Sequence, residues 1–321
     1  MSLGELHNSV RETGCGLASG QAAVDRLQQR SNSLSALRSM ARQAWAQPDP
    51  DLKCQAVMQL AGAATALAAG TGKTAESPQT LDLSIATDRS LEPGRPGKPQ
   101  LVHPSRVPKR RLGSKAGRGA MLHAIAHIEF NAINLALDAI WRFHAMPLEF
   151  VADWVSVALD EARHFQMLTI EMVRDSYLYG DFDAHDGLWE MARKTADDCQ
   201  ARMAMVPRVL EARGLDATPA IQAKLRNVGD QIAVDILQTI VDEEVRHVRI
   251  GDYWFRRICR QLNDDPEQKF RVLAKRFDAP LPGGRINREA RLAAGFSEPE
   301  LQWLSADRNT DQQPDGQGRQ T

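Results

Sequence analysis

The chain has 321 residues, of which 43% are hydrophobic and 25% are charged. This is the balance of an ordinary globular protein, so the composition excludes a largely disordered or fibrous chain. The 40 basic and 41 acidic residues give a net charge of −1, so a nucleic-acid or membrane-surface role would depend on a local patch of charge.

The cysteines are too widely spaced for a disulfide framework or a zinc ribbon. No two of them form a Cys-x-x-Cys pair, and they stand at Cys15, Cys54, Cys199 and Cys259. Reduced, scattered thiols are typical of cytoplasmic proteins. The sequence also shows no run of about 18 apolar residues and no basic-then-apolar leader. We therefore expect a cytoplasmic protein that does not span a membrane.

The first third of the chain predicts one helical hairpin between irregular segments. Residues 1–32 are polar and predict a flexible leader. Apolar residues at helical spacing over 33–72, interrupted at Pro48-Asp49-Pro50, predict two short helices. Residues 73–118 are rich in Pro, Gly and basic residues and predict an extended arm. Its densest positive charge, 109–111, predicts a solvated linker, with contact to a nucleic acid as the alternative.

Helical periodicity dominates from residue 119 to 263 and predicts an all-α protein built on a four-helix bundle. We expect helices over 119–145, 148–178, from about 186 onward, and over 231–262. Residues 264–305 predict short C-terminal helices, the last with a capping box formed by Ser297 and Glu300. Residues 306–321 are polar and predict a disordered tail.

Two Glu-x-x-His motifs stand in different predicted helices. They are Glu161-Ala-Arg-His164 and Glu244-Val-Arg-His247. Residues three apart share a helix face, so each motif points a carboxylate and an imidazole in the same direction. Both motifs lie within the apolar stripe of their helix, the face that a bundle buries. A buried carboxylate requires compensation, and oxygen with imidazole nitrogen suits iron, manganese or zinc.

A third glutamate lies on an apolar face of the helix predicted over 119–145. Glu129 is flanked on that face by Ile125, Ala132 and Ile133. Glu129 and Glu161 lie at similar distances along the chain on either side of the turn near Pro147, so their carboxylates return to nearly the same height. The pattern predicts a carboxylate-bridged two-metal site within the bundle.

The fourth carboxylate is Glu211 in our interpretation, with Glu190 as the alternative. A turn at 227–229 brings Glu211 level with Glu244, and Gly214 and Pro219 must then mark a kink or irregular turn within a helix. A turn at Gly214 to Pro219 would instead bring Glu190 level with Glu244. The face of Glu190 carries three charged residues and belongs in water, which favours Glu211.

These residues give the chain a resemblance to the ferritin-like superfamily of di-metal carboxylate proteins. It resembles most closely an uncharacterised bacterial ferritin-like family, and it is more distantly similar to tRNA-hydroxylating monooxygenases. The match spans about residues 33 to 305 and rests on HAIAHIEFNAINLALDAIWRF, DEARHF, AHDGLWEMA, VPRVLEARGLD and NREARLAAGFSE. The resemblance implies a ferritin-like four-helix bundle and a metal centre, and it supports Glu211 as a ligand. It implies no particular substrate.

Two further acids directly precede the motif glutamates. In the wider superfamily an acid at the position of Asp160 or Glu243 can hydrogen-bond a ligand imidazole across the site, and a metal-bound histidine generally needs such a partner. The alternative is that both are ordinary acids of the helix surface. We read His123 and His127 as polar anchors, because neither shares the face of Glu129.

The sequence therefore predicts a non-haem di-iron oxidoreductase, a hydroxylase or oxidase that uses dioxygen, with Glu129, Glu161, His164, Glu211, Glu244 and His247 as metal ligands. Its substrate is an unidentified small molecule and its partner an electron donor; a homodimer is a further possibility. One alternative is a ferritin-like metal-binding or peroxide-scavenging protein without an organic substrate. Another is an RNA-modifying hydroxylase that grips RNA through 104–118.

Overall fold

The computed structural model describes residues 31–70, 80–86, 88, 90–108, 112–282 and 286–306. Within these ranges the regular structure is helical, and the only β-type pairing is an isolated bridge between Leu101 and Ala184. The predicted all-α class is confirmed. Most of the predicted flexible leader and disordered tail, and the basic run 109–111, lie outside the described residues.

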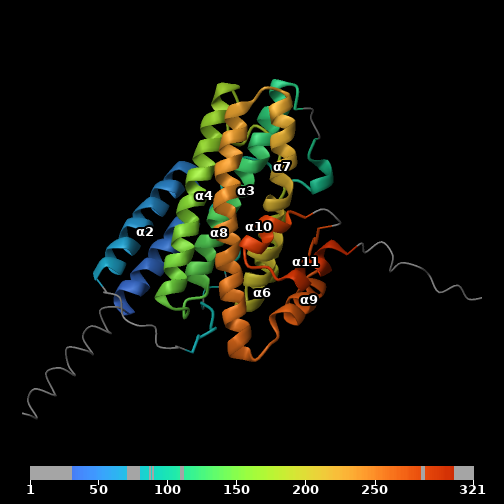
Figure 1. The fold of residues 1–321 in the computed structure, drawn as a ribbon. Coiled ribbons are helices and arrows are strands. Elements are labelled where there is room, and N and C mark those ends of the chain that lie inside the picture. The colour runs from blue at the N-terminus through green and yellow to red at the C-terminus, as the bar shows by residue number, and fades with distance from the viewer. Residues whose placement is uncertain are drawn as a thin grey trace, which may run out of the picture.

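Long helices run side by side through the body of the protein (Figure 1). They are α3 (Lys115–Arg142), α4 (Leu148–Arg174), α7 (Ala212–Asn227) and α8 (Gln231–Leu262). Helix α4 packs along α3 and α8, and α8 packs along α7. The predicted bounds of α8 are confirmed, and the carboxylate of Asp230 caps it by accepting a hydrogen bond from the Ala233 N–H.

The stretch before α7 differs from the predicted single helix with a kink at Gly214 and Pro219. It consists of α5 (Gly187–Lys194), α6 (Cys199–Met205) and a π-helical turn, η2 (Val206–Glu211). Helix α7 continues through both Gly214 and Pro219, so the prediction put the irregularity in the wrong place. The physical reason is Pro207: it has no N–H to donate, and the wider π turn accommodates it.

Gly251 on α8 leaves the space that Pro207 occupies. A Cβ atom at this glycine would lie 2.2 Å from the Pro207 Cγ atom and 2.3 Å from its Cβ atom. The close approach of η2 to α8 therefore depends on the missing side chain.

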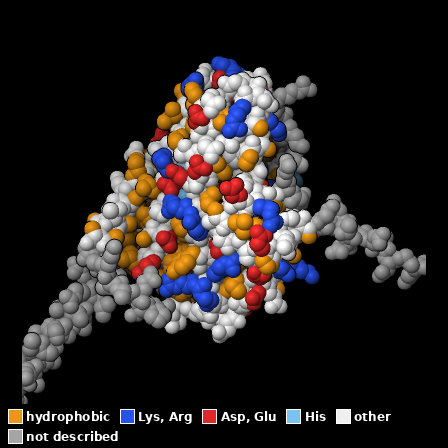
Figure 2. Space-filling view, in the orientation of Figure 1, with side chains coloured by type: hydrophobic (Ala, Val, Ile, Leu, Met, Phe, Trp, Pro, Cys, Tyr) orange, Lys and Arg blue, Asp and Glu red, His pale blue; other side chains and the backbone are white. Residues whose placement is uncertain are grey.

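The N-terminal helices and the segment after them pack on this body. Residues 31–46 and α2 (Pro50–Gly70) form the predicted helical pair, and α2 packs against α4. Beyond residue 80, the predicted extended arm lies against the helices: Leu81 and Pro93 are buried, and the Val102 N–H donates to the carbonyl of Ala184. On the face shown in Figure 2, basic and acidic side chains are interspersed.

Three short helices complete the chain: α9 (Pro266–Arg276), α10 (Arg288–Ala293) and α11 (Glu298–Ser305). The capping box of Ser297 and Glu300 is confirmed. The buried Arg208 of η2 forms ion pairs with Asp252 on α8 and with Glu300 on α11. This arginine therefore links the π turn to both α8 and the C-terminal helices.

Only one described helix, α3, is long and apolar enough to cross a membrane. In the 18-residue stretch of α3 that is most apolar, 72% is buried inside the protein. That burial is typical of the core helix of a water-soluble protein.

We expect Gly251→Ala to destabilise the protein by about 1–3 kcal/mol, because the new methyl group collides with the proline ring of η2. Gly62→Ala is the matched control: it also lies within a helix, but no atom lies within 4 Å of the place that its Cβ atom would take. The control should stabilise the protein by about 0.5–1 kcal/mol. Urea unfolding measures both changes, and equal stabilities of the two variants would contradict the assigned role of Gly251.

Candidate metal centre

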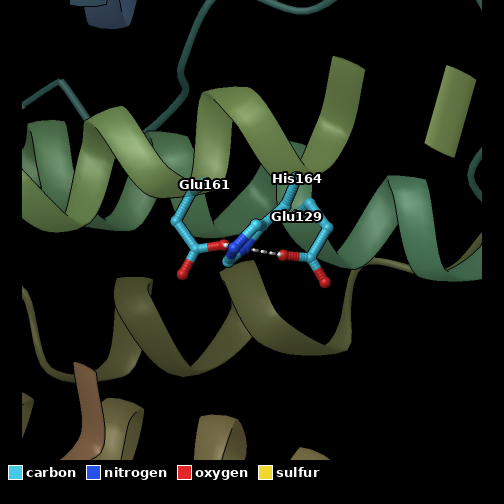
Figure 3. A group of neighbouring side chains, drawn as sticks. All are labelled: Glu129, Glu161 and His164. Atoms are coloured by element: carbon cyan, nitrogen blue, oxygen red, sulfur yellow. Dashed lines mark hydrogen bonds and ion pairs between the residues drawn. The ribbon is translucent and has the colours of Figure 1, made fainter. Parts of the chain in front are cut away.

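The two Glu-x-x-His motifs face each other across the contact between α4 and α8. Glu161 and His164 on α4 are 1% and 0% exposed, and Glu244 and His247 on α8 are 8% and 0% exposed. Glu129 of α3 joins them and is 5% exposed. Figure 3 shows the side chains of Glu129, Glu161 and His164 converging between the helices.

Glu161 lies between the two imidazoles. Its Oε2 atom is 3.3 Å from the Nδ1 atom of His164, and its Oε1 atom is 2.8 Å from the Nδ1 atom of His247. The same two nitrogens lie 3.3 Å from Glu129 Oε2 and 3.2 Å from Glu244 Oε2, respectively. Two clusters with similar donor sets thus share one carboxylate.

Glu211 joins the group from η2. It is 7% exposed, and it lines the same cavity as Glu129, Glu161 and Glu244. Its buried Oε2 atom has no hydrogen-bond partner among the described residues. Glu190, the alternative, lies exposed on α5 at the outer part of this cavity. The structure therefore brings Glu211, and not Glu190, into the buried cluster.

The acids that precede the motif glutamates contact the opposite imidazoles. Glu243 Oε2 lies 2.7 Å from His164 Nε2, and Asp160 Oδ2 lies 3.2 Å from His247 Nε2. Each helix thus supplies the outer partner of the other helix's histidine. With its Nε2 atom engaged in this way, each imidazole directs Nδ1 toward the glutamates.

Two arginines that the sequence patterns did not mark as functional complete this arrangement. Arg163 forms ion pairs with Glu243 and Asp160, and Arg246 forms one with Asp160. The sequence did contain one signal for them: each arginine directly precedes a motif histidine. They hold both outer acids in the ionised form that an imidazole N–H prefers as its acceptor.

Burial and mutual repulsion dominate the electrostatics of the glutamates. Burial and the neighbouring Glu161 carboxylate raise the pKa of Glu129, and burial together with the Glu244 charge raises the pKa of Glu211. For Glu161, burial opposes ionisation, but the contacts with His247 and His164 outweigh it and lower its pKa.

The neighbouring carboxylates also raise the pKa values of both imidazoles, which favours their charged form. Burial disfavours the charged form of His164, but Glu129 and Glu161 outweigh burial and raise its pKa to about 11. The pKa of His247 is also raised, because Glu161 and Asp160 outweigh its burial. Without another cation, protons on these residues must balance much of the buried negative charge.

The donor set fits metal ions. Two groups of three side chains, Glu129 with Glu161 and His164, and Glu161 with Glu244 and His247, bring one potential ligand atom each within 4.8 Å of one another. Within the described residues no lysine or arginine forms an ion pair with these four glutamates. Four carboxylates match the charge of two divalent cations, and the unpartnered Glu211 oxygen would gain a ligand.

A cavity of about 590 Å³ opens onto the glutamates. Its walls come from α3, α4, α5, η2, α7 and α8, together with Pro104, His185, Asp278 and Pro280. This volume is within the usual range of small-molecule sites, about 300–1,000 Å³.

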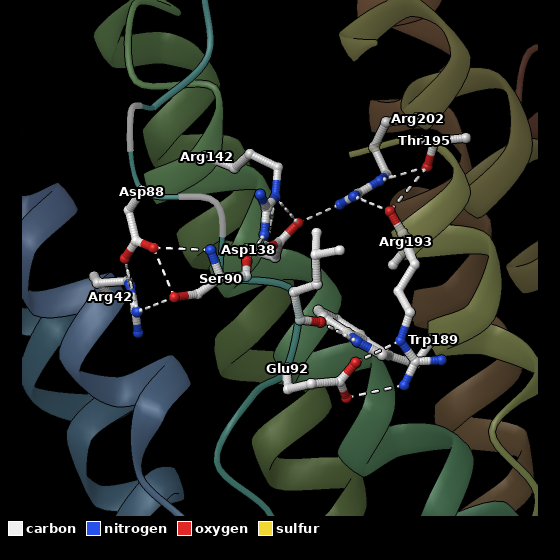
Figure 4. A network of polar contacts seen from close by, with 12 residues as sticks. Arg42, Asp88, Ser90, Glu92, Asp138, Arg142, Trp189, Arg193, Thr195 and Arg202 are labelled. Atoms are coloured by element: carbon white, nitrogen blue, oxygen red, sulfur yellow. Dashed lines mark hydrogen bonds and ion pairs between the residues drawn. The ribbon is translucent and has the colours of Figure 1, made fainter. Parts of the chain in front are cut away.

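A polar network fixes α5, which forms part of the cavity wall (Figure 4). The Trp189 indole N–H donates to the carbonyl of Leu91 at 2.6 Å, and Arg202 donates to the carbonyl of Ala192 at 2.6 Å. Asp138 of α3 is fully buried and forms ion pairs with both Arg202 and Arg142. The wall of the cavity is thereby joined to the helix that carries Glu129.

Other polar residues lie away from the cluster. His123 accepts a hydrogen bond from the Gly180 N–H at 2.9 Å, and His127 Nδ1 lies 2.8 Å from the Tyr179 hydroxyl. Both contacts agree with their predicted role as anchors. In the basic stretch, Lys115 and Arg118 form ion pairs with acids of this chain, which leaves them less available to a polyanion.

Comparison with known proteins gives one family and one relative. A protein family described as "Protein of unknown function (DUF455)" matches residues 46–302. An "Uncharacterized protein" of Haemophilus influenzae (strain ATCC 51907 / DSM 11121 / KW20 / Rd) is 48% identical over 216 residues, which cover 65% of this chain and 75% of that protein. No solved structure matches the chain significantly.

The raised pKa values predict that the metal-free protein becomes less stable as the pH rises. His164 contributes stability that is complete below the pKa of an unfolded histidine, about 6.5, and that is lost as the pH rises toward its folded pKa of about 11. The raised pKa values of Glu129, Glu211 and His247 act in the same direction.

We expect the free energy of unfolding in a chelator to fall from pH 6.5 to 9, by up to about 1.4 kcal/mol per pH unit for each such group. Urea titrations at several pH values measure the slope. His164→Gln should make it shallower, whereas His123→Gln, at a histidine whose pKa is lowered to about 4 by burial, should leave the slope above pH 6.5 unchanged. A metal-free protein that gains stability over this range would refute the assignment.

Proposed function

The chain belongs to the DUF455 family of proteins of unknown function, and from its own site we propose that it is a ferritin-like di-metal carboxylate protein that catalyses an oxygen-dependent oxidation. The observation that carries this proposal is the shared carboxylate: Glu161 contacts both imidazoles, between two further glutamates. A carboxylate in this position can bridge a pair of metal ions, whereas a single structural ion has no use for one.

The origin of the side chains supports the ferritin-like assignment. In such proteins two helices each provide one glutamate and two others each provide a Glu-x-x-His motif. Here α3 and η2 carry Glu129 and Glu211, and α4 and α8 carry the two motifs.

The residues would hold two iron ions as follows. Glu129 and His164 would serve one position, Glu211, Glu244 and His247 would serve the other, and Glu161 would serve both. Manganese accepts the same donors, and zinc would bind without supplying redox chemistry. When bound, a pair of ferrous ions supplies electrons for the reduction of dioxygen.

The protein's own groups prepare the site for this chemistry. Asp160 and Glu243 fix the orientation of the imidazoles, and Arg163 and Arg246 keep those acids ionised. The aliphatic wall keeps water away from the reacting atoms. For a hydroxylation, a substrate R–H, dioxygen, two electrons and two protons give R–OH and water, and the electrons come from a reduced protein or flavin donor.

The cavity favours an organic substrate over simple peroxide scavenging. Peroxide and dioxygen need only a narrow channel, but the space above the glutamates measures about 590 Å³. A peroxidase without an organic substrate has no use for an apolar pocket of this size.

We expect Glu161→Ala to abolish binding of both metal ions, because it removes the carboxylate common to both positions. Glu211→Gln should lower the affinity of one position by about 10-fold or more. Glu190→Gln is the matched control and should bind metal like the unaltered chain. Metal content after iron loading, with circular dichroism to verify helicity, measures these effects, and full metal content in Glu161→Ala would contradict the proposal.

The reduced, iron-loaded protein should consume dioxygen on exposure to air and develop the near-ultraviolet absorption of a bridged ferric pair. Stopped-flow absorption and an oxygen electrode measure the two signals, with Glu161→Ala as the inactive control. Tight iron binding without oxygen uptake would reduce the function to metal binding.

A further inference from the structure

The charged side chains that line the cavity fall into two groups, one at its buried end and one at its open end. The buried end carries the glutamates of the metal centre, Glu129, Glu161, Glu211 and Glu244. The other charged side chains of its lining are all exposed and mark the open end: Glu190, Lys194, Arg213 and Asp278.

The rest of the cavity is lined largely by aliphatic side chains. Its wall includes Ile125 and Ile128 of α3, Ile221 of α7, and Leu237, Ile240 and Val241 of α8. No phenylalanine, tyrosine or tryptophan is among the described residues that line the cavity. A nucleobase or another planar ring gains binding energy by stacking on aromatic side chains, and among the described lining residues only the His185 imidazole offers such a face. A flexible aliphatic group matches this wall better.

The open end suits a polar group. It offers two cations and two acids, and within the described residues none of these four side chains forms an ion pair with another part of the chain. Polar groups brought to this rim keep contact with water, so they avoid the cost of burial.

We propose that the site takes an aliphatic amphiphile, whose polar head stays at the rim formed by Glu190, Lys194, Arg213 and Asp278 and whose hydrocarbon body fills the cavity. The assignment rests on the proposed function, for which it supplies the substrate class. Because the glutamates are buried and the rim residues are exposed, the carbon presented to the metal centre belongs to the hydrocarbon body. A nucleoside is disfavoured, because its base would have to pack against the aliphatic side chains of the cavity.

The test uses the full chain in metal-free form, so that binding is measured apart from catalysis. The probe is cis-parinaric acid, a linear fluorescent fatty acid whose emission rises in an apolar site. We expect saturable binding, displacement by dodecanoic acid, and no displacement by adenosine. Iron uptake is measured separately, on portions of the same preparations after iron loading.

Two variants obstruct the aliphatic wall, and one variant is their control. Ile240→Trp fills the wall from α8, where Ile240 is 7% exposed, and Ile221→Asp places a charge at a half-buried position of α7. Each should weaken probe binding by about 10-fold or more. Ile170→Trp adds the same indole at a site that is 69% exposed and outside the cavity lining, and it should bind like the unaltered chain.

The outcomes separate the two proposals. Equal probe affinity in all variants, no binding by the unaltered chain, or displacement by adenosine in preference to dodecanoic acid would overturn the substrate class. Probe binding that depends on Ile240 or Ile221 in a chain that takes up no iron would support the substrate class and contradict the metal centre. If Ile240→Trp fails to fold, the comparison of Ile221→Asp with Ile170→Trp decides.

Discussion

The burial of four carboxylates in one apolar interior is the constraint on which the rest of this structure depends. Glu129, Glu161, Glu211 and Glu244 are all nearly inaccessible to water, and like charges at this separation cannot all ionise without a compensating cation. Two imidazoles supply part of the compensation, but only by keeping their protons far above the pH at which a free histidine loses them. The pKa of His164 is raised to about 11. An interior built for stability alone would place apolar side chains at these positions. The presence of four glutamates here is best explained by the cations that the proposed function requires.

The surrounding fold positions these charges through reciprocal contacts. Each motif helix contributes the acid that orients the histidine of the other, so α4 and α8 cannot slide or rotate past one another without breaking both contacts. Arg163 extends this link by contacting acids on both helices. A second set of ion pairs, centred on Arg208, connects η2 to α8 and α11. The position of Glu211 is thus determined by a π turn that is held from two sides.

The sequence predicted the regular parts of this arrangement better than the irregular ones. Helix α8 and its Asp230 cap follow from apolar periodicity and a local hydrogen bond, both of which are encoded within a few residues. The spacing of the motifs indicated a buried cluster, because a carboxylate within an apolar stripe is costly to bury unless a cation compensates its charge. The π turn could not be predicted, because the effect of Pro207 depends on Gly251, which is far away in the sequence and close only in the fold. The roles of Arg163 and Arg246 likewise depend on contacts between helices, and such contacts leave no periodic signal.

The proposed function assigns chemistry and selectivity to separate parts of this molecule. The cluster draws its six side chains from three long helices and one anchored turn, and any chain with the same carboxylates and imidazoles would present nearly the same donors. The cavity above it is different, because its walls also include α5 and positions near Pro104 and Asp278, which connect to the rest of the chain through loops. The polar network around Asp138 joins α5 to α3, so the less regular wall is rigidly placed relative to the glutamates. In our proposal, substitutions in that wall would change which molecule is admitted while the cluster itself stays intact. In our proposal, the aliphatic lining and its charged rim therefore carry the specificity, and the buried glutamates and histidines carry the reaction.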